Sequence, residues 1–190
     1  MIIGLAGRAG SGKNYVATTH IVPLGFSEIA LADEMKVRAV ALGVATYDEA
    51  FRTKPPHVRK WLQEEGTERG RALFGEDCWC RALAARVRLM QDRWGIHDFV
   101  VTDVRFPNEA RFLREQLGGF VLKILAPTRV AMSSVTDEQR RHSSEESVDS
   151  LDSVDGILRN DVGDAPWVGR HVDAFVTRFS RSEARRVSKS

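Results

Sequence analysis

The sequence predicts an α/β fold with a mostly parallel central sheet. Short apolar runs at 2–6, 26–31, 99–104 and 120–125 have the length and composition of buried parallel strands. Segments with helical periodicity lie between these runs, and glycines or prolines mark most of the boundaries. The 190 residues are 43% hydrophobic and 28% charged, which is the balance of one globular domain with a buried core rather than of a disordered chain.

The first half of the chain follows from local patterns. In chain order we expect a strand at 2–6, a helix at 13–20, a strand at 26–31 and a helix from 33 to 42. Pro23 and Gly25 separate the second and third of these elements, and Gly43 ends the last. From 48 to 94 the pattern is helical, with predicted breaks at Pro55–Pro56, Gly66 and Gly75. This half therefore combines a strand–helix–strand unit with a helical region.

The second half returns to strands. After the strand at 99–104 we expect a helix from 107 to 117, a strand at 120–125, a polar connection at 126–146 and a strand near 156–158. The segment 166–179 is predicted to be helical, and the basic, serine-rich residues 181–190 to form a frayed tail. Ligands of such folds bind beyond the carboxyl ends of the strands.

Charge and cysteine content exclude several classes of protein. The net charge of +2 is too small to indicate nucleic-acid binding, so any anion site must be local. Cys78 and Cys80 lie too close together for a disulfide framework and make a poor zinc site. Apolar stretches long enough to span a membrane and a cleavable signal are both lacking in the sequence. We expect a cytoplasmic protein.

Residues 7–13 read GRAGSGK, the GxxxxGK part of a phosphate-binding loop, between a predicted strand and a predicted helix. The backbone N–H groups of such a loop converge on phosphate, and the lysine reaches the β- and γ-phosphates. The alternative is a tight glycine turn with an exposed lysine. The predicted phosphate-binding residues are Gly7, Ala9, Gly10, Ser11, Gly12, Lys13 and Asn14.

The loop motif is incomplete, because Asn14 stands where a serine or threonine normally ligates magnesium. Its amide oxygen is a weaker ligand for a hard cation than a carboxylate. Either the metal is held mainly by ATP, water and Asp103, with Asn14 as a further ligand, or activity is reduced. Both readings stay open at this point.

Four further segments, spanning most of the chain, resemble the bacteriophage deoxynucleoside monophosphate kinases. They read ALADEMK at 30–36, LQEEGTERGR at 62–71 with GEDCW at 75–79, TDVRFPNE at 102–109, and HSSE at 142–145 leading to Asn160–Asp161. Members of that family often read GKDT at the loop, whereas here Asn14–Tyr15 follows Lys13.

The resemblance implies a P-loop NTPase three-layer fold and a single kinase domain over residues 1–190. Within it we expect a helical acceptor-binding insertion at about 33–94, a lid at about 127–146 and a basic tail at about 181–190. The implied reaction is phosphoryl transfer from ATP with Mg²⁺ to deoxynucleoside monophosphates. Deoxy selectivity comes only from the resemblance.

Two predicted residues lie at the end of the third strand, where phosphoryl transfer needs positioning and charge neutralisation. Asp103 is expected to orient magnesium or its waters, and otherwise to cap the helix that follows. Arg105 points to the same side if the strand continues, and its guanidinium then suits a substrate phosphate; the alternative is an ion pair with Glu109.

The remaining candidates are less specific. Lys36 and Arg71 either bind the acceptor phosphate or lie on a solvated face, and Trp79 either stacks on a base or packs in the core. Asn160 and Asp161 are expected near the adenine through the resemblance. Arg140 or Arg141 of the lid is expected to stabilise the transferred group on closure.

Three other functions remain open. A different P-loop kinase, similar to dephospho-coenzyme A kinase, would share the sheet, loop and lid. A non-catalytic nucleotide-binding protein would explain Asn14. Nucleic-acid binding would rest on the basic segment 178–189 alone, and such tails are usually solvated. The expected partners are small nucleotides, with a homodimer as one further possibility, and neither nucleic acid nor membrane.

Overall fold

The structure, a computed structural model, describes residues 1–132, 147–152, 154–161 and 165–187. Its contacts divide the chain into two compact units, one formed by Met1–Glu28 with Ile96–Ser190 and the other by Ile29–Gly95. The second unit contains the helical region expected at 33–94. The single domain over 1–190 stays a prediction, and each unit is described by itself.

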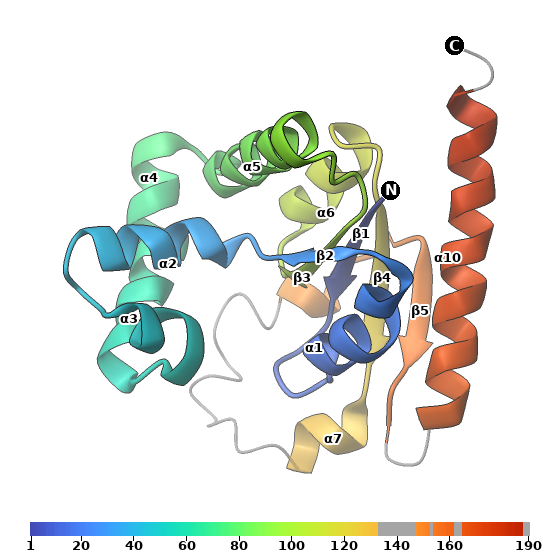
Figure 1. Ribbon diagram of the computed structural model, residues 1–190. Helices are drawn as coiled ribbons and strands as arrows, with labels where there is room; N and C mark the ends of the chain where they lie inside the picture. The colour runs from blue at the N-terminus through green and yellow to red at the C-terminus, as the bar shows by residue number, and fades with distance from the viewer. Residues whose placement is uncertain (133–146, 153, 162–164, 188–190) are drawn as a thin grey trace. The chain divides into compact units, whose positions relative to one another are not determined.

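The first unit carries a five-stranded sheet, with strands in the order β2-β3-β1-β4-β5 (Figure 1). The strands are β1 (Ile2–Ala6), β2 (Ser27–Ile29), β3 (Phe99–Val104), β4 (Phe120–Leu125) and β5 (Gly156–Arg159). The central strand β1 is parallel to both β3 and β4, and β4 is parallel to β5. The predicted mostly parallel sheet is confirmed.

Helices cover both faces of this sheet, which makes the predicted three layers. Ile3 and Leu5 point to one face, where they share a core with Val16 of α1 (Lys13–Val16) and Val172 of α10 (Ala165–Val187). Gly4 faces the other side, where α6 (Pro107–Glu115) packs. A Cβ on Gly4 would lie 2.7 Å from Leu113 Cδ1 of α6, so a larger residue would force this buried side chain to shift.

The connections differ in detail from the predicted elements. The helix expected at 13–20 is a short α1 that continues as a π turn (Ala17–Ile21) and a 3₁₀ turn (Val22–Leu24). Gly25, at a φ of 96°, ends the 3₁₀ turn. The polar connection expected at 126–146 begins with a helix, α7 (Pro127–Met132), and its residues 133–146 lie outside the described residues.

The frayed tail predicted at 181–190 is wrong over most of its length. Helix α10 begins at Ala165, as expected within one residue, but continues to Val187 instead of ending at Phe179. Residues 181–187 read RSEARRV and contain neither glycine nor proline. Alanine, arginine and glutamate are good helix formers, so this basic composition extends a helix as readily as it forms a coil.

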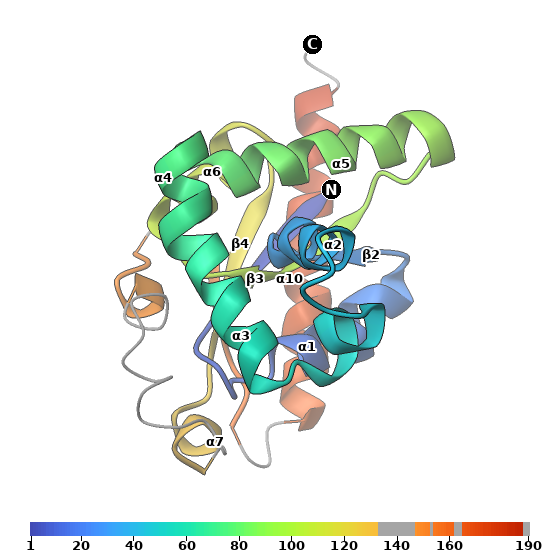
Figure 2. The same cartoon turned by 90° about the vertical axis from the view of Figure 1, so that its left-hand side faces the viewer.

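The second unit is helical. It contains α2 (Ala32–Ala41), a π turn (Glu49–Thr53), α3 (Pro56–Gln63), a second π turn (Glu64–Arg69), α4 (Gly70–Phe74) and α5 (Cys78–Trp94). Figure 2 shows the backbone running without interruption from α3 through the second π turn into α4. The predicted break at Gly66 is therefore wrong, because Gly66 lies inside a π turn that relaxes the backbone without ending the helix.

Among the helices that the structure describes, none is both long enough and apolar enough to cross a membrane.

Candidate active site

The predicted phosphate loop joins the central strand β1 to α1, in the strand–loop–helix order that the motif requires. Gly10 and Gly12 both have a φ of 83°, a left-handed conformation that residues with a Cβ rarely adopt. At Gly12 the requirement is also steric, since a Cβ there would lie 2.3 Å from Asn160 Nδ2. The loop therefore depends on glycine both for its backbone angles and for its fit against β5.

Lys13 lies over its own loop. Its Nζ donates hydrogen bonds to the carbonyl oxygens of Gly7 at 2.5 Å and Arg8 at 3.0 Å, and the residue is only 8% exposed. The alternative of a glycine turn with an exposed lysine is wrong. Lysine holds its charge as a compact ammonium on a flexible stem, so a bound phosphate can replace these carbonyl partners.

Asn160 supports the loop from the end of β5. It is 1% exposed, its Nδ2 donates to the Ser11 carbonyl oxygen at 2.9 Å, and its backbone N–H donates to the Leu125 carbonyl oxygen at 2.8 Å. Asn160 Oδ1 and Ser11 Oγ are both buried and have no hydrogen-bond partner within the described residues. The structure thus places Asn160 against the phosphate loop, while its role near adenine stays a prediction.

Asp161 holds the start of α7. Its Oδ1 accepts hydrogen bonds from the backbone N–H groups of Thr128 at 3.0 Å and Arg129 at 3.4 Å. These are two of the N–H groups that the first turn of a helix leaves unpaired. The predicted role of Asp161 near adenine also stays a prediction, and its observed contact is with the segment where the lid was expected to begin.

An arginine of the loop is paired with a carboxylate from the far side of the expected lid. Arg8 Nε lies 3.0 Å from Asp149 Oδ1, and Arg8 Nη2 binds Oδ2 of the same carboxylate. These hydrogen bonds hold the pKa of Asp149 below its usual value. Lys123 Nζ donates to the Asp149 carbonyl oxygen at 3.0 Å. Sequence reasoning missed this contact, because 141 residues separate its partners.

Asp103 lies at the carboxyl end of β3, directly beside the strand that leads into the loop. The register passes from Gly4 opposite Val101 to Ala6 opposite Val104, so β3 has one extra residue there. Such a bulge turns side chains at a strand end and is common beside active sites. The position at the ligand-binding edge agrees with the prediction, whereas the bulge left no signal in the sequence.

Arg105 lies just beyond β3, which ends at Val104 as the sequence predicts, so the strand does not continue through it. Its backbone N–H donates to Glu109 Oε2 at 2.8 Å, and the N–H of Phe106 donates to the same oxygen at 3.1 Å. The carboxylate that caps α6 is therefore Glu109, which is 5% exposed. Phosphate binding by Arg105 stays a prediction.

The predicted acceptor-binding residues Arg71 and Trp79 belong to the second unit and converge on Gly66. Arg71 Nε and Trp79 Nε1 donate to the Gly66 carbonyl oxygen at 3.0 and 3.2 Å, and both residues are 8% exposed. The indole lies against Gly70, where a Cβ would be 2.4 Å from the ring. These contacts favour the packing alternative for Trp79, and contact with an acceptor stays a prediction for both residues.

Lys36, the third of these residues, lies in a charge cluster on α2 and α5. Its Nζ is 2.8 Å from Asp33 Oδ1, and Arg86 Nη1 is 2.9 Å from Asp33 Oδ2. Arg86 Nε also donates to Glu34 Oε1 at 2.7 Å. Burial raises the pKa of Asp33, but the hydrogen bonds from Lys36 and Arg86 outweigh it and lower the pKa. Sequence reasoning did not single out Arg86.

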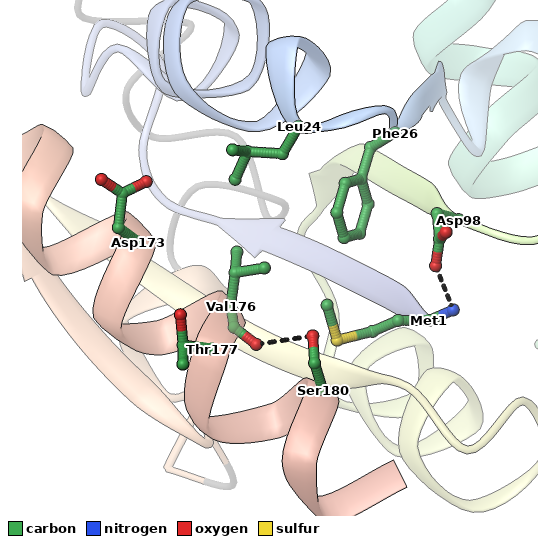
Figure 3. A pocket seen from close by; sticks show the side chains of 8 residues that line it. All are labelled: Met1, Leu24, Phe26, Asp98, Asp173, Val176, Thr177 and Ser180. Atoms are coloured by element: carbon green, nitrogen blue, oxygen red, sulfur yellow. Dashed lines mark hydrogen bonds and ion pairs between the residues drawn. The ribbon is translucent and has the colours of Figure 1, made fainter. Parts of the chain in front are cut away.

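Arg140 and Arg141, the predicted catalytic lid arginines, lie outside the described residues. A cavity of about 470 Å³ opens elsewhere in the first unit, beside the start of β1 (Figure 3). Its lining residues are Met1, Leu24, Phe26, Asp98, Asp173, Val176, Thr177 and Ser180. This cavity lies at the amino-terminal end of β1, whereas the phosphate loop follows its carboxyl-terminal end. The cavity is therefore separate from the phosphate site.

The parallel sheet, the glycine loop after its central strand and the buried Lys13 define a P-loop kinase, that is, a phosphotransferase. Comparison with known proteins narrows this class of P-loop kinases to one family. A protein of Acanthamoeba polyphaga mimivirus, named "Putative deoxynucleotide monophosphate kinase", is 31% identical over 180 residues, which cover 84% of this chain and 88% of the relative. The chain belongs to the family of deoxynucleotide monophosphate kinases.

Solved structures share the fold at low sequence identity. The structure of TT1252 from Thermus thermophilus matches with a TM-score of 0.57 and 18% identity over 94% of this chain and 97% of that one. A dephospho-CoA kinase from Campylobacter jejuni matches with a TM-score of 0.52 and 18% identity over 96% and 98%. A search against family models found no match.

Proposed function

We propose that this protein transfers the γ-phosphoryl group of ATP to a deoxynucleoside monophosphate and releases the deoxynucleoside diphosphate and ADP. The observation that carries this proposal is the phosphate loop, with Lys13 buried over it at the carboxyl end of β1. Family membership supports the acceptor class, because the mimivirus relative carries that activity in its name. The bacteriophage origin suggested by the sequence resemblance stays a prediction.

The phosphate loop holds the donor in this mechanism. The loop amides and Lys13 bind the β- and γ-phosphates and neutralise the charge that develops as the γ-phosphoryl group leaves. The Gly7 and Arg8 carbonyl oxygens, which now accept from Lys13 Nζ, give up this cation to the phosphates. The attacking atom is a phosphate oxygen of the acceptor, so the bond to the γ-phosphorus forms as the bond to the β–γ bridging oxygen breaks.

The residues present fit a magnesium ion that binds together with the phosphates of the nucleotide. The described part of the chain contains no group of three or more acidic, histidine or cysteine side chains that could hold a metal by itself. Magnesium commonly keeps several waters and takes one or two carboxylates besides the substrate phosphates. Asp103 would supply such a carboxylate and the exposed Asn14 an amide oxygen. The ion would neutralise phosphate charge.

The candidate cations for acceptor binding are Lys36 and Arg71 of the second unit, and Arg105 of the first unit is a separate candidate. Lys36 and Arg71 are now held by Asp33 and by the Gly66 carbonyl oxygen, so an acceptor phosphate would compete with these partners. Arg140 or Arg141 would complete the charge neutralisation. Lid closure would also exclude water and favour transfer over hydrolysis of ATP.

The test is phosphoryl transfer from ATP with Mg²⁺ to dAMP, dGMP, dCMP, dTMP and their ribonucleotide counterparts, with ATP hydrolysis in the absence of acceptor as the control. Transfer to at least one deoxynucleotide is expected. Transfer to dephospho-coenzyme A alone would establish the related kinase instead. ATP binding without any transfer would support the non-catalytic alternative, in which Asn14 marks a lost activity. A supporting variant for that alternative is Asn14→Asp, which would then raise the transfer rate.

A further inference from the structure

We propose that Arg129, the third residue of α7, binds the phosphate oxygens of the nucleotide held in the loop. The proposal rests on the proposed function, in that ATP is the molecule occupying the loop. It adds a substrate-binding residue that the sequence did not indicate, because 116 positions separate Arg129 from Lys13. Arg129 is distinct from the predicted lid arginines Arg140 and Arg141, and unlike them it belongs to the described residues.

The first observation is position. A Cβ built on Gly12 would lie 4.0 Å from Arg129 Nη1, so the guanidinium reaches the residue immediately before Lys13. The Gly12 carbonyl oxygen accepts the N–H of Val16, and Gly12 is thus the N-terminal boundary of α1, the side on which the loop presents its amides. An arginine beside this point lies within reach of a phosphate that the same amides bind.

The second observation is charge. Arg129 is half-buried, its Nε is fully buried without a hydrogen-bond partner, and no carboxylate of the described residues pairs with its guanidinium. Arg8 and Arg86, by contrast, each bind carboxylates directly. Burying an uncompensated cation is costly, and such groups normally have a counter-charge. The triphosphate of a bound nucleotide would supply a counter-charge that the described residues do not provide.

The third observation is that the backbone of this segment is anchored by hydrogen bonds. The Asp161 carboxylate accepts the backbone N–H of Arg129, and the neighbouring Asn160 side chain is hydrogen-bonded to the loop at Ser11. Both anchors follow β5, so one short segment holds α7 and the phosphate loop together. An arginine on an anchored backbone loses less conformational freedom on binding, and its guanidinium can donate two parallel hydrogen bonds to phosphate oxygens.

The experiment measures binding of ATP, ADP and adenosine by calorimetry for the wild-type protein and for Arg129→Gln and Arg129→Lys. The matched control is Arg178→Gln, which removes the same charge from an exposed position on α10. Arg129→Gln removes charge-assisted hydrogen bonds to phosphate, so we expect it to weaken ATP binding roughly tenfold or more. Adenosine binding should stay unchanged, Arg129→Lys should be intermediate and Arg178→Gln should match wild type.

Equal losses for ATP and adenosine, or no loss for ATP, would overturn the assignment. The unfolding temperature without nucleotide shows whether each variant folds. If Arg129→Gln does not fold, the test uses Arg129→Lys, which keeps the charge and the aliphatic stem. This variant should weaken ATP binding and leave adenosine binding unchanged. A wild-type protein that binds ATP but phosphorylates no acceptor would refute the proposed function while leaving the Arg129 result readable, and one that binds no ATP would refute both.

Discussion

Replacing Gly12 by alanine isolates the fit between the phosphate loop and β5. The left-handed φ of 83° costs a residue with a Cβ about 1–2 kcal/mol. The new Cβ would also lie 2.3 Å from Asn160 Nδ2, and Asn160 is 1% exposed and has little room to turn. Moving that amide breaks its hydrogen bond to Ser11, worth about 1 kcal/mol. We expect Gly12→Ala to lower the free energy of unfolding by about 2–3 kcal/mol.

For a chain of this length that loss corresponds to roughly 4–12 °C in the unfolding temperature, which differential scanning calorimetry measures directly. Gly25→Ala is the matched control, since Gly25 has a φ of 96° with nothing within 4 Å of its Cβ position. The control carries the backbone strain without the collision. Urea unfolding of both variants gives the two free energies on one scale.

The collision itself is tested by a double-mutant cycle. Asn160→Ala removes the amide that the new Cβ would meet, so Gly12→Ala should cost about 1 kcal/mol less in the Asn160→Ala background than in the wild type. A Gly12→Ala variant no less stable than Gly25→Ala, together with strictly additive effects in the cycle, would refute the steric argument. The strain of the left-handed φ would then be the whole effect.

Three further predictions follow from single contacts. Lys13→Ala should abolish phosphoryl transfer in a coupled assay while circular dichroism shows an intact fold; near-normal turnover would exclude the phosphate role. Asp33→Asn should cost about 1 kcal/mol at pH 7. Because the pKa of Asp33 is lowered, that stability exists above the ordinary carboxyl pKa and disappears as pH falls through the folded value, so the two urea curves should converge in acid; a constant gap would contradict this. Trp79→Phe should cost about 1 kcal/mol by losing the hydrogen bond to Gly66, whereas Trp94→Phe, at a 65% exposed position, should cost little; equal losses would contradict it.

Parts of the candidate site were predictable because their signals are local in the sequence. The glycine spacing and Lys13 at 7–13 follow directly from an apolar run, so the strand–loop–helix context could be stated from the sequence. Asp103 was predicted from the apolar run at 99–104, by the rule that parallel strands present ligands at their carboxyl ends. In both cases one short segment carries the information.

Other contacts left no local signal. Asn160 reaches the loop across 149 positions and Arg8 reaches Asp149 across 141, so these partners are chosen by the packing of β5 and the segments around it. The bulge in β3 depends on the pairing of that strand with β1. Whether Arg105 points to the same side as Asp103 depended on the strand continuing past Val104, and it does not continue.

The sequence by itself determined the class of fold, the phosphate loop and the helical character of residues 48–94, since apolar periodicity and glycine spacing act over a few neighbouring residues. Only the tertiary structure decided the strand order, the packing of Trp79 against Gly70 and the placement of Arg129 beside Gly12. These features depend on which distant surfaces bury one another, and burial is a property of the assembled chain rather than of any one segment.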